Sequence, residues 1–181
     1  SSSVPSASME VLEGENACSL SWSIFRHGEE KGLWGSDVAL TYDGCLGDLA
    51  SLSPYLHSRQ CPVLVKKSEE SVSTQMCKAT TSRQSVLVVG GFKSFPDEGI
   101  APIAASSAEI HRFVGDGPYD ANEKINMWIG LRSKSDSFLV VSIWHPEDAL
   151  AVGPFAAKSS SLILLEDPQN LDSVAHAIAY I

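Results

Sequence analysis

Short apolar runs separated by segments of helical character constrain the fold of this 181-residue chain more than any other feature. Runs of this length that are rich in β-branched residues favour buried strands over helices. We therefore predict strands at residues 61–67, 85–92, 137–145 and 160–167. An earlier run, Cys18 to Phe25, alternates apolar and polar side chains with a period of two. This alternation predicts a further strand over these residues.

Helical patterns fill much of the sequence between these runs. Leucines recur at helical spacing between Gly44 and His57, and Pro146 begins a segment with two acids in its first turn, as helices often do. A terminal helix is predicted from Pro168 onward, with Asp167 as its cap. Further helices are predicted at 73–84, 103–113, 121–136 and 146–157, and a glycine-punctuated loop at 28–40.

Strands that alternate with helices predict an α/β fold, here a three-layer α/β/α sandwich with a mostly parallel central sheet. We expect residues 17–181 to form a single domain, since a chain of this length suits one hydrophobic core. Residues 1–16 have neither the basic segment nor the apolar segment of a secretory signal, so we expect a flexible leader.

Charge and cysteine content limit the partners of the chain. A formal net charge of -9 disfavours nucleic acid and anionic membrane, so a site for an anionic ligand must be a local positive pocket. The spacing of the cysteines excludes a CxxC pair and argues against a zinc site, and we expect free thiols and a cytoplasmic location. These cysteines are Cys18, Cys45, Cys61 and Cys77.

The predicted strand at Cys18 ends in Arg26, His27 and Gly28. One interpretation is a strand that runs into a polar turn. The other is a strand that brings a cation and an imidazole to the edge of the sheet, where a phosphate could bind, because ligands of parallel sheets bind at the carboxyl ends of strands. His145 follows a later predicted strand and would lie at the same edge.

Three segments resemble the histidine phosphatase superfamily, the phosphoglycerate-mutase-like fold, and in particular its small single-domain branch of phosphohistidine phosphatases. They are SIFRHGEE at 23–30, DVALTYDGCLGDLASL at 37–52 and SFLVVSIWHPEDAL at 137–150. The first is similar to the strand and Arg-His-Gly of that family, the second to its Asp, Leu-Thr and Gly before a helix. The third is similar to its late strand ending in a histidine.

The resemblance implies roles for four residues. His27 would be the nucleophile that forms a phosphohistidine, and Arg26 would bind the phosphate oxygens through its planar guanidinium. His145 would donate to the same oxygens and stabilise developing charge. Gly28 would allow the backbone to pass close to the anion.

The chain departs from the family pattern after residues 61–67. Members usually have a second arginine there, but no arginine occurs between Arg59 and Arg83. Lys66 and Lys67 could replace it as phosphate-binding point charges, or they could be surface lysines. The proton donor is also open, with Asp97 and Glu98 as candidates and Glu98 as the residue we assign.

Taken together, these features predict a metal-independent and cofactor-free hydrolase of phosphoric monoesters or phosphoproteins that works through a phosphohistidine. Its partners would be a phosphorylated protein or a small phosphate ester. The missing arginine favours an alternative, a catalytically degenerate phosphatase-like domain that is used for protein binding or assembly. A third interpretation is a structural or interaction protein in which Arg-His-Gly is coincidental.

Overall fold

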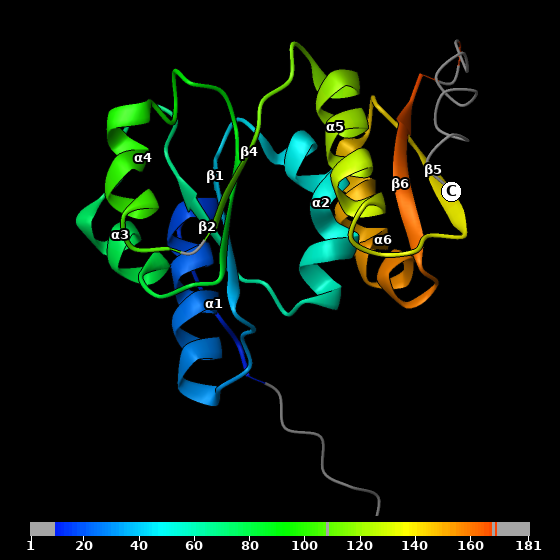
Figure 1. The fold of residues 1–181 in the computed structure, drawn as a ribbon. Coiled ribbons are helices and arrows are strands. Elements are labelled where there is room, and N and C mark those ends of the chain that lie inside the picture. The colour runs from blue at the N-terminus through cyan, green and yellow to red at the C-terminus, as the bar shows by residue number, and fades with distance from the viewer. Residues whose placement is uncertain (1–9, 108, 168, 170–181) are drawn as a thin grey trace, which may run out of the picture.

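The computed structural model describes residues 10–107, 109–167 and 169, and it contains two parallel sheets (Figure 1). The first sheet has the strand order β2-β1-β3-β4, and the second pairs β5 with β6. The strands are β1 (Asp37–Tyr42), β2 (Val63–Lys66), β3 (Ser85–Val89), β4 (Glu109–Phe113), β5 (Ser137–Ser142) and β6 (Ser161–Glu166).

Helices cover both faces of the first sheet. Figure 1 shows α1, α3 and α4 on one face, and α2 and α5 between the first sheet and the pair β5–β6, with α6 beside them. The α/β fold with a parallel sheet between two helical layers is therefore confirmed. The helices are α1 (Ala17–Lys31), α2 (Leu46–Ser58), α3 (Thr74–Thr80), α4 (Asp97–Ala104), α5 (Pro118–Gly130) and α6 (Pro146–Lys158).

The two faces of the first sheet bury separate halves of the core. Val38 and Leu40 of β1 point into a cluster with side chains of α1, α3 and α4, whereas Ala39 packs against residues of α2 and α5. This separation follows from the period of two of a strand, which sends successive side chains to opposite faces. Because both faces are covered, β1 and β3 are buried without alternation, as parallel strands usually are.

Helix α2 lies between the two sheets and is buried on nearly all sides. Six consecutive positions, 49–54, are buried, which is the pattern of a helix enclosed by other elements. Its approach to α6 is close, because a Cβ on Gly153 would lie 2.6 Å from Ser53 Oγ. That hydroxyl donates to the carbonyl oxygens of Ala50 and, across the helix contact, of Ala149 at 3.1 Å.

Two asparagines of α5 take the place of a third strand in the second sheet. In the described part of the chain β6 pairs with β5 alone, so its other edge needs hydrogen-bond partners inside the protein. Asn122 Nδ2 and Asn126 Nδ2 each donate to the Ile163 carbonyl at 2.9 Å. Asn122 Oδ1 accepts from the Leu165 N–H at 3.2 Å. Both asparagines are almost fully buried.

The strand predicted from Cys18 is wrong, because this segment is part of helix α1. The helix begins with a capping box in which Asn16 Oδ1 accepts from the Ser19 N–H at 3.0 Å and Ser19 Oγ accepts from the Asn16 N–H at 3.1 Å. Its buried positions are Ser21, Phe25 and Gly28, spaced by four and three residues, so the burial follows the helix and not the alternation in the sequence.

Other predictions from the sequence are compared with the structure in turn. The loop predicted at 28–40 contains the start of β1, which is the centre of the first sheet. The helix predicted at 103–113 is wrong, since α4 ends at Ala104 and β4 occupies 109–113. The terminal helix after Pro168 and most of the predicted leader lie outside the described residues. Within the described residues, no helix combines the length and apolar character needed to cross a membrane.

Candidate functional site

Arg26 and His27 lie on helix α1, so no strand delivers them to a sheet edge. His27 Nε2 is 3.5 Å from Glu10 Oε2, while Arg26 is exposed. His145 follows β5, which belongs to the second sheet, and it is the N-cap residue of α6. The predicted arrangement, with both histidines at the rim of one sheet, is wrong because one is on a helix and the other follows a strand of a different sheet.

Gly28 is explained by packing rather than by approach to an anion. A Cβ at this position would lie 2.1 Å from Trp34 Cε2, far closer than two carbon atoms in van der Waals contact. The indole is held in place because Trp34 Nε1 donates to the Phe25 carbonyl at 2.8 Å. The glycine of Arg-His-Gly therefore makes room for the tryptophan side chain.

Lys66 is buried and its ammonium group is saturated within its own loop. Nζ donates to the carbonyl oxygens of Glu70 at 2.8 Å, Lys67 at 3.2 Å and Ser68 at 3.4 Å, which uses all three donors. It also lies 4.9 Å from the centre of the Phe95 ring, and burial lowers the pKa of Lys66. Lys66 thus closes the loop after β2. Lys67 is exposed, with Nζ 3.9 Å from Glu70 Oε1.

Glu98 and its neighbour Asp97 lie in the first turn of α4, and both are exposed. Asp97 is bound by Arg112, whose Nη1 donates to Oδ1 at 2.7 Å. Arg112 Nη2 also donates to the Phe95 carbonyl. This arginine ties the segment after β3 to β4, which is a structural role that the sequence did not reveal.

A buried thiol lies at the carboxyl edge of the first sheet. Cys45 Sγ is 3.3 Å from Asp48 Oδ2, at the start of α2. Burial, followed by the negative charge of Asp48, raises the pKa of Cys45 to about 12. Cys61 is also buried, and burial raises its pKa above the ordinary thiol value. All four cysteines are free thiols, as predicted.

The raised pKa values of Cys45 and Cys61 predict that the folded protein loses stability in alkaline solution. In the unfolded chain a thiol ionises near its ordinary pKa of 9.0, whereas Cys45 in the folded protein keeps its proton up to about 12. Between these values the folded state binds more protons, so the free energy of unfolding falls as pH rises, by up to about 1.4 kcal/mol per pH unit for one thiol.

Urea unfolding at a series of pH values between about 8 and 11 measures this slope. We expect Cys45→Ala to remove its share of the slope and to leave the share of Cys61. A free energy of unfolding that does not change over this range, or an unchanged slope in Cys45→Ala, would contradict the assignment.

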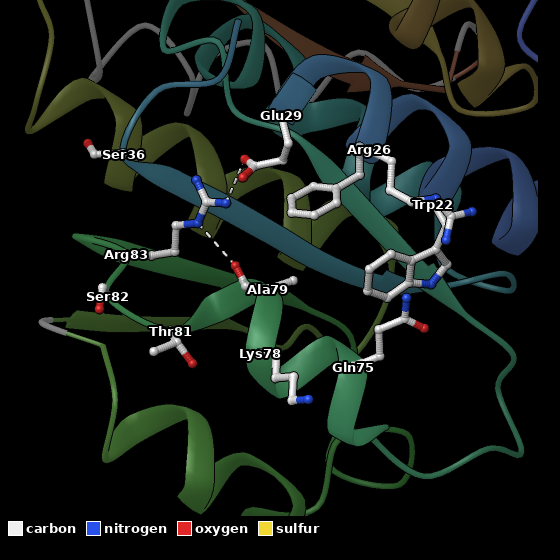
Figure 2. A pocket seen from close by; sticks show the side chains of 11 residues that line it. Trp22, Arg26, Glu29, Ser36, Gln75, Lys78, Ala79, Thr81, Ser82 and Arg83 are labelled. Carbon is white, nitrogen blue, oxygen red and sulfur yellow. Dashed lines mark hydrogen bonds and ion pairs between the residues drawn. The ribbon is translucent and has the colours of Figure 1, made fainter. Parts of the chain in front are cut away.

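A groove between α1 and α3, which we call the α1–α3 groove, is one of the open cavities of the protein (Figure 2). Its volume is about 560 Å³, within the range of ligand pockets. Helix α1 contributes one wall and α3 with the turn after it contributes the other. The lining residues are Trp22, Phe25, Arg26, Glu29, Ser36, Gln75, Lys78, Ala79, Thr81, Ser82 and Arg83.

The cations of this groove differ in whether an acid neutralises them. Arg83 Nη2 donates to Glu29 Oε1 at 2.8 Å, and its Nε donates to the Ala79 carbonyl at 3.0 Å, as the dashed lines of Figure 2 show. Arg26 and Lys78 make no ion pair with any residue in the described part of the chain. The groove therefore has an excess of positive charge, although the chain as a whole is acidic.

A second groove has a volume of about 470 Å³. It is lined by residues from both sheets and from α2, α5 and α6. Arg59 Nε is 3.6 Å from the buried Asp37, and Lys134 Nζ is 4.0 Å from Asp136. The guanidinium of Arg132 lies 4.1 Å from the centre of the Trp128 ring. Its cations are thus paired or stacked within the protein.

Metal ligands are not gathered in the part of the chain that the structure describes. Among residues 10–107, 109–167 and 169, no group of three or more histidine, cysteine, aspartate or glutamate side chains is placed to hold a metal ion. We take the α1–α3 groove as the candidate ligand site, because Arg26 and Lys78 make no ion pair with a described residue. Of the residues selected from the sequence, only Arg26 lies in it.

The fold of this chain is similar to parts of two solved structures. No family model matches the sequence, and no curated protein matches it. Among solved structures, Cwp6 from Clostridium difficile is similar to 91% of this chain, with a TM-score of 0.73 and 14% identity. Cwp8 from Clostridium difficile is similar to 85% of it, with a TM-score of 0.68 and 19% identity. The chain spans about a quarter of each neighbour, 26% in both cases.

These neighbours correct the interpretation of the sequence. They are cell wall proteins, and neither is a histidine phosphatase. The resemblance to the histidine phosphatase superfamily, the phosphohistidine hydrolase and its degenerate alternative, and the cytoplasmic location are therefore wrong. The physical reason lies in α1, because an Arg-His-Gly on a helix, with its glycine packed against Trp34, is not the strand-end motif of that family.

Proposed function

We propose that this chain is one module of a larger cell-surface protein and that its role there is attachment to the cell envelope rather than catalysis. The observation that supports this proposal is the extent of the structural similarity. Nearly all of this chain corresponds to about a quarter of each of two cell wall proteins. A domain that recurs as part of longer surface proteins fits a role in positioning them.

The side-chain chemistry is consistent with binding. The α1–α3 groove is open and offers hydrogen-bond donors and aromatic surface. The thiol of Cys45 keeps its proton at neutral pH because its pKa is raised to about 12, the opposite of what an activated nucleophile requires. Lys66, a buried cation, holds loop carbonyl oxygens in place.

A co-sedimentation experiment tests the proposal. The chain is fused to a fluorescent protein and mixed with insoluble envelope fragments of the organism that encodes it, with the fluorescent protein alone as control. We expect the fusion to sediment with the fragments, to saturate, and to be displaced by the unlabelled chain. A fusion that stays in the supernatant with the control would contradict envelope attachment.

A further inference from the structure

We propose that the α1–α3 groove docks an acidic peptide segment of a protein partner that carries an apolar anchor residue. This inference goes beyond envelope attachment and does not depend on it. It combines three observations on the groove, namely the way two helices build its walls, the aromatic surface on its floor and the two cations without acidic partners.

The groove is built from one face of each helix. Trp22, Phe25, Arg26 and Glu29 follow one another at spacings of three, one and three residues, which places them on one side of α1. On α3, Gln75 is three and four residues before Lys78 and Ala79, so these side chains also share a face. Figure 2 shows the Gln75 amide of α3 pointing toward the Trp22 indole of α1.

The floor is apolar and is held by the core. The rings of Trp22 and Phe25 meet edge to face, with 5.7 Å between their centres and an angle of 81° between their planes. Phe25 is buried, and Trp22 packs against the same core cluster while part of its ring stays accessible. The core thus fixes an aromatic surface on which an apolar side chain of a ligand can pack.

The charge of the groove selects an acidic ligand. Arg26 of α1 and Lys78 of α3 both line the groove, and neither makes an ion pair with a described residue. Both side chains can only donate hydrogen bonds, and they bind anionic acceptors such as carboxylates most strongly. On a chain with a formal charge of -9, this local positive charge would attract acidic segments and orient them.

The same features favour a peptide over a carbohydrate. A neutral sugar would leave the charges of Arg26 and Lys78 without anionic partners, whereas the carboxylates of an acidic peptide would supply them. The aromatic surface of Trp22 and Phe25 lines the same groove as these cations, so a peptide with an apolar side chain next to its carboxylates can use both. Grooves between helices are a common docking place for such segments.

Fluorescence anisotropy with a labelled peptide of alternating glutamate and leucine tests the proposal. We expect saturable binding that weakens with salt, a tenfold or greater loss in Arg26→Glu and in Lys78→Glu, and no binding of the lysine–leucine peptide. Lys31→Glu is the matched control, since Lys31 lies on the same helix and outside the groove. It should bind as the wild type does.

The aromatic floor is tested in parallel. Trp22→Ala should weaken binding at least tenfold, and a glutamate–serine peptide should bind equally weakly to the wild type. Trp144→Ala is the control, because Trp144 is an exposed tryptophan that follows β5 and lies outside the groove. Circular dichroism verifies that Trp22→Ala is folded, and the surface variants Arg26→Glu and Lys78→Glu decide the question if it is not.

Other outcomes would overturn the inference. Absence of saturable binding would exclude the peptide ligand, and equal binding in Arg26→Glu and Lys78→Glu would place the site elsewhere. Competition by polygalacturonate at the same concentration of charge would show a site for polyanions in general. Sedimentation with envelope fragments that survives in Arg26→Glu would leave the envelope proposal intact, so the two proposals fail separately.

Discussion

Replacing Asn122 with alanine is expected to lower the free energy of unfolding by about 3–5 kcal/mol, the largest loss that we predict for a single side chain of this protein. The Asn122 amide makes hydrogen bonds on both sides. It donates to Ser51 Oγ at 2.8 Å and to the Ile163 carbonyl at 2.9 Å, and it accepts from the Leu165 N–H. The substitution would leave that N–H buried without an acceptor.

The cost follows from the topology of the second sheet. A sheet of two strands is marginal by itself, and the unpaired edge of β6 faces the interior instead of water. Asn126 can still donate to the Ile163 carbonyl in the variant, but its amide nitrogen is not an acceptor for Leu165. We therefore expect Asn126→Ala to cost less than Asn122→Ala.

Equilibrium unfolding in urea measures both variants. Met127→Ala is the control on the same helix, because Met127 is exposed and its removal should change the free energy of unfolding by no more than about 0.5 kcal/mol. A loss below about 1 kcal/mol in Asn122→Ala would show that β6 does not depend on the asparagine for its hydrogen bonds.

Gly28→Ala is expected to destabilise the protein by about 2–4 kcal/mol, although alanine is a better helix former than glycine. The added Cβ would lie 2.1 Å from the Trp34 ring, so either the indole or α1 must move. Movement of the indole would break the hydrogen bond from Nε1 to the Phe25 carbonyl and open space beside the core.

The matched control is Gly99→Ala, which also replaces a glycine within a helix. A Cβ on Gly99 would have its nearest neighbours at 3.6 Å, an ordinary contact. Helix propensity alone should then raise the free energy of unfolding by up to about 1 kcal/mol. Thermal or urea unfolding of both variants compares them, and effects of the same sign would show that Trp34 does not determine the residue at position 28.

The sequence was sufficient for elements whose pattern reflects burial on every side. The apolar runs that became β2, β3 and β6 are largely buried, and the leucines that predicted α2 are in a helix enclosed by other elements. The run that became β5 was also predicted as a strand, although Val140 is 57% exposed. In such elements the local pattern and the tertiary environment agree, because an apolar run has no favourable alternative to burial.

The sequence misled where one local pattern suited two structures. The alternation from Cys18 to Phe25 has the period of a strand, yet Ser21, Phe25 and Gly28 also have the spacing of a helix face. Tertiary contacts stabilise the helix. Ser21 Oγ accepts a hydrogen bond from the Val65 N–H of β2, and the Trp34 ring packs against Gly28. The functional interpretation failed with this element, because it required a strand end.

By itself the sequence determined the α/β class, the free thiols, and the acidic character that makes any positive groove distinctive. Only the tertiary structure decided that β5 and β6 form a separate sheet, that two asparagines complete it, and that Arg26 and Lys78 line one groove. The physical reason is that hydrophobic periodicity reports which side of an element is buried. Which elements then become neighbours depends on hydrogen bonds and packing between residues far apart in the chain.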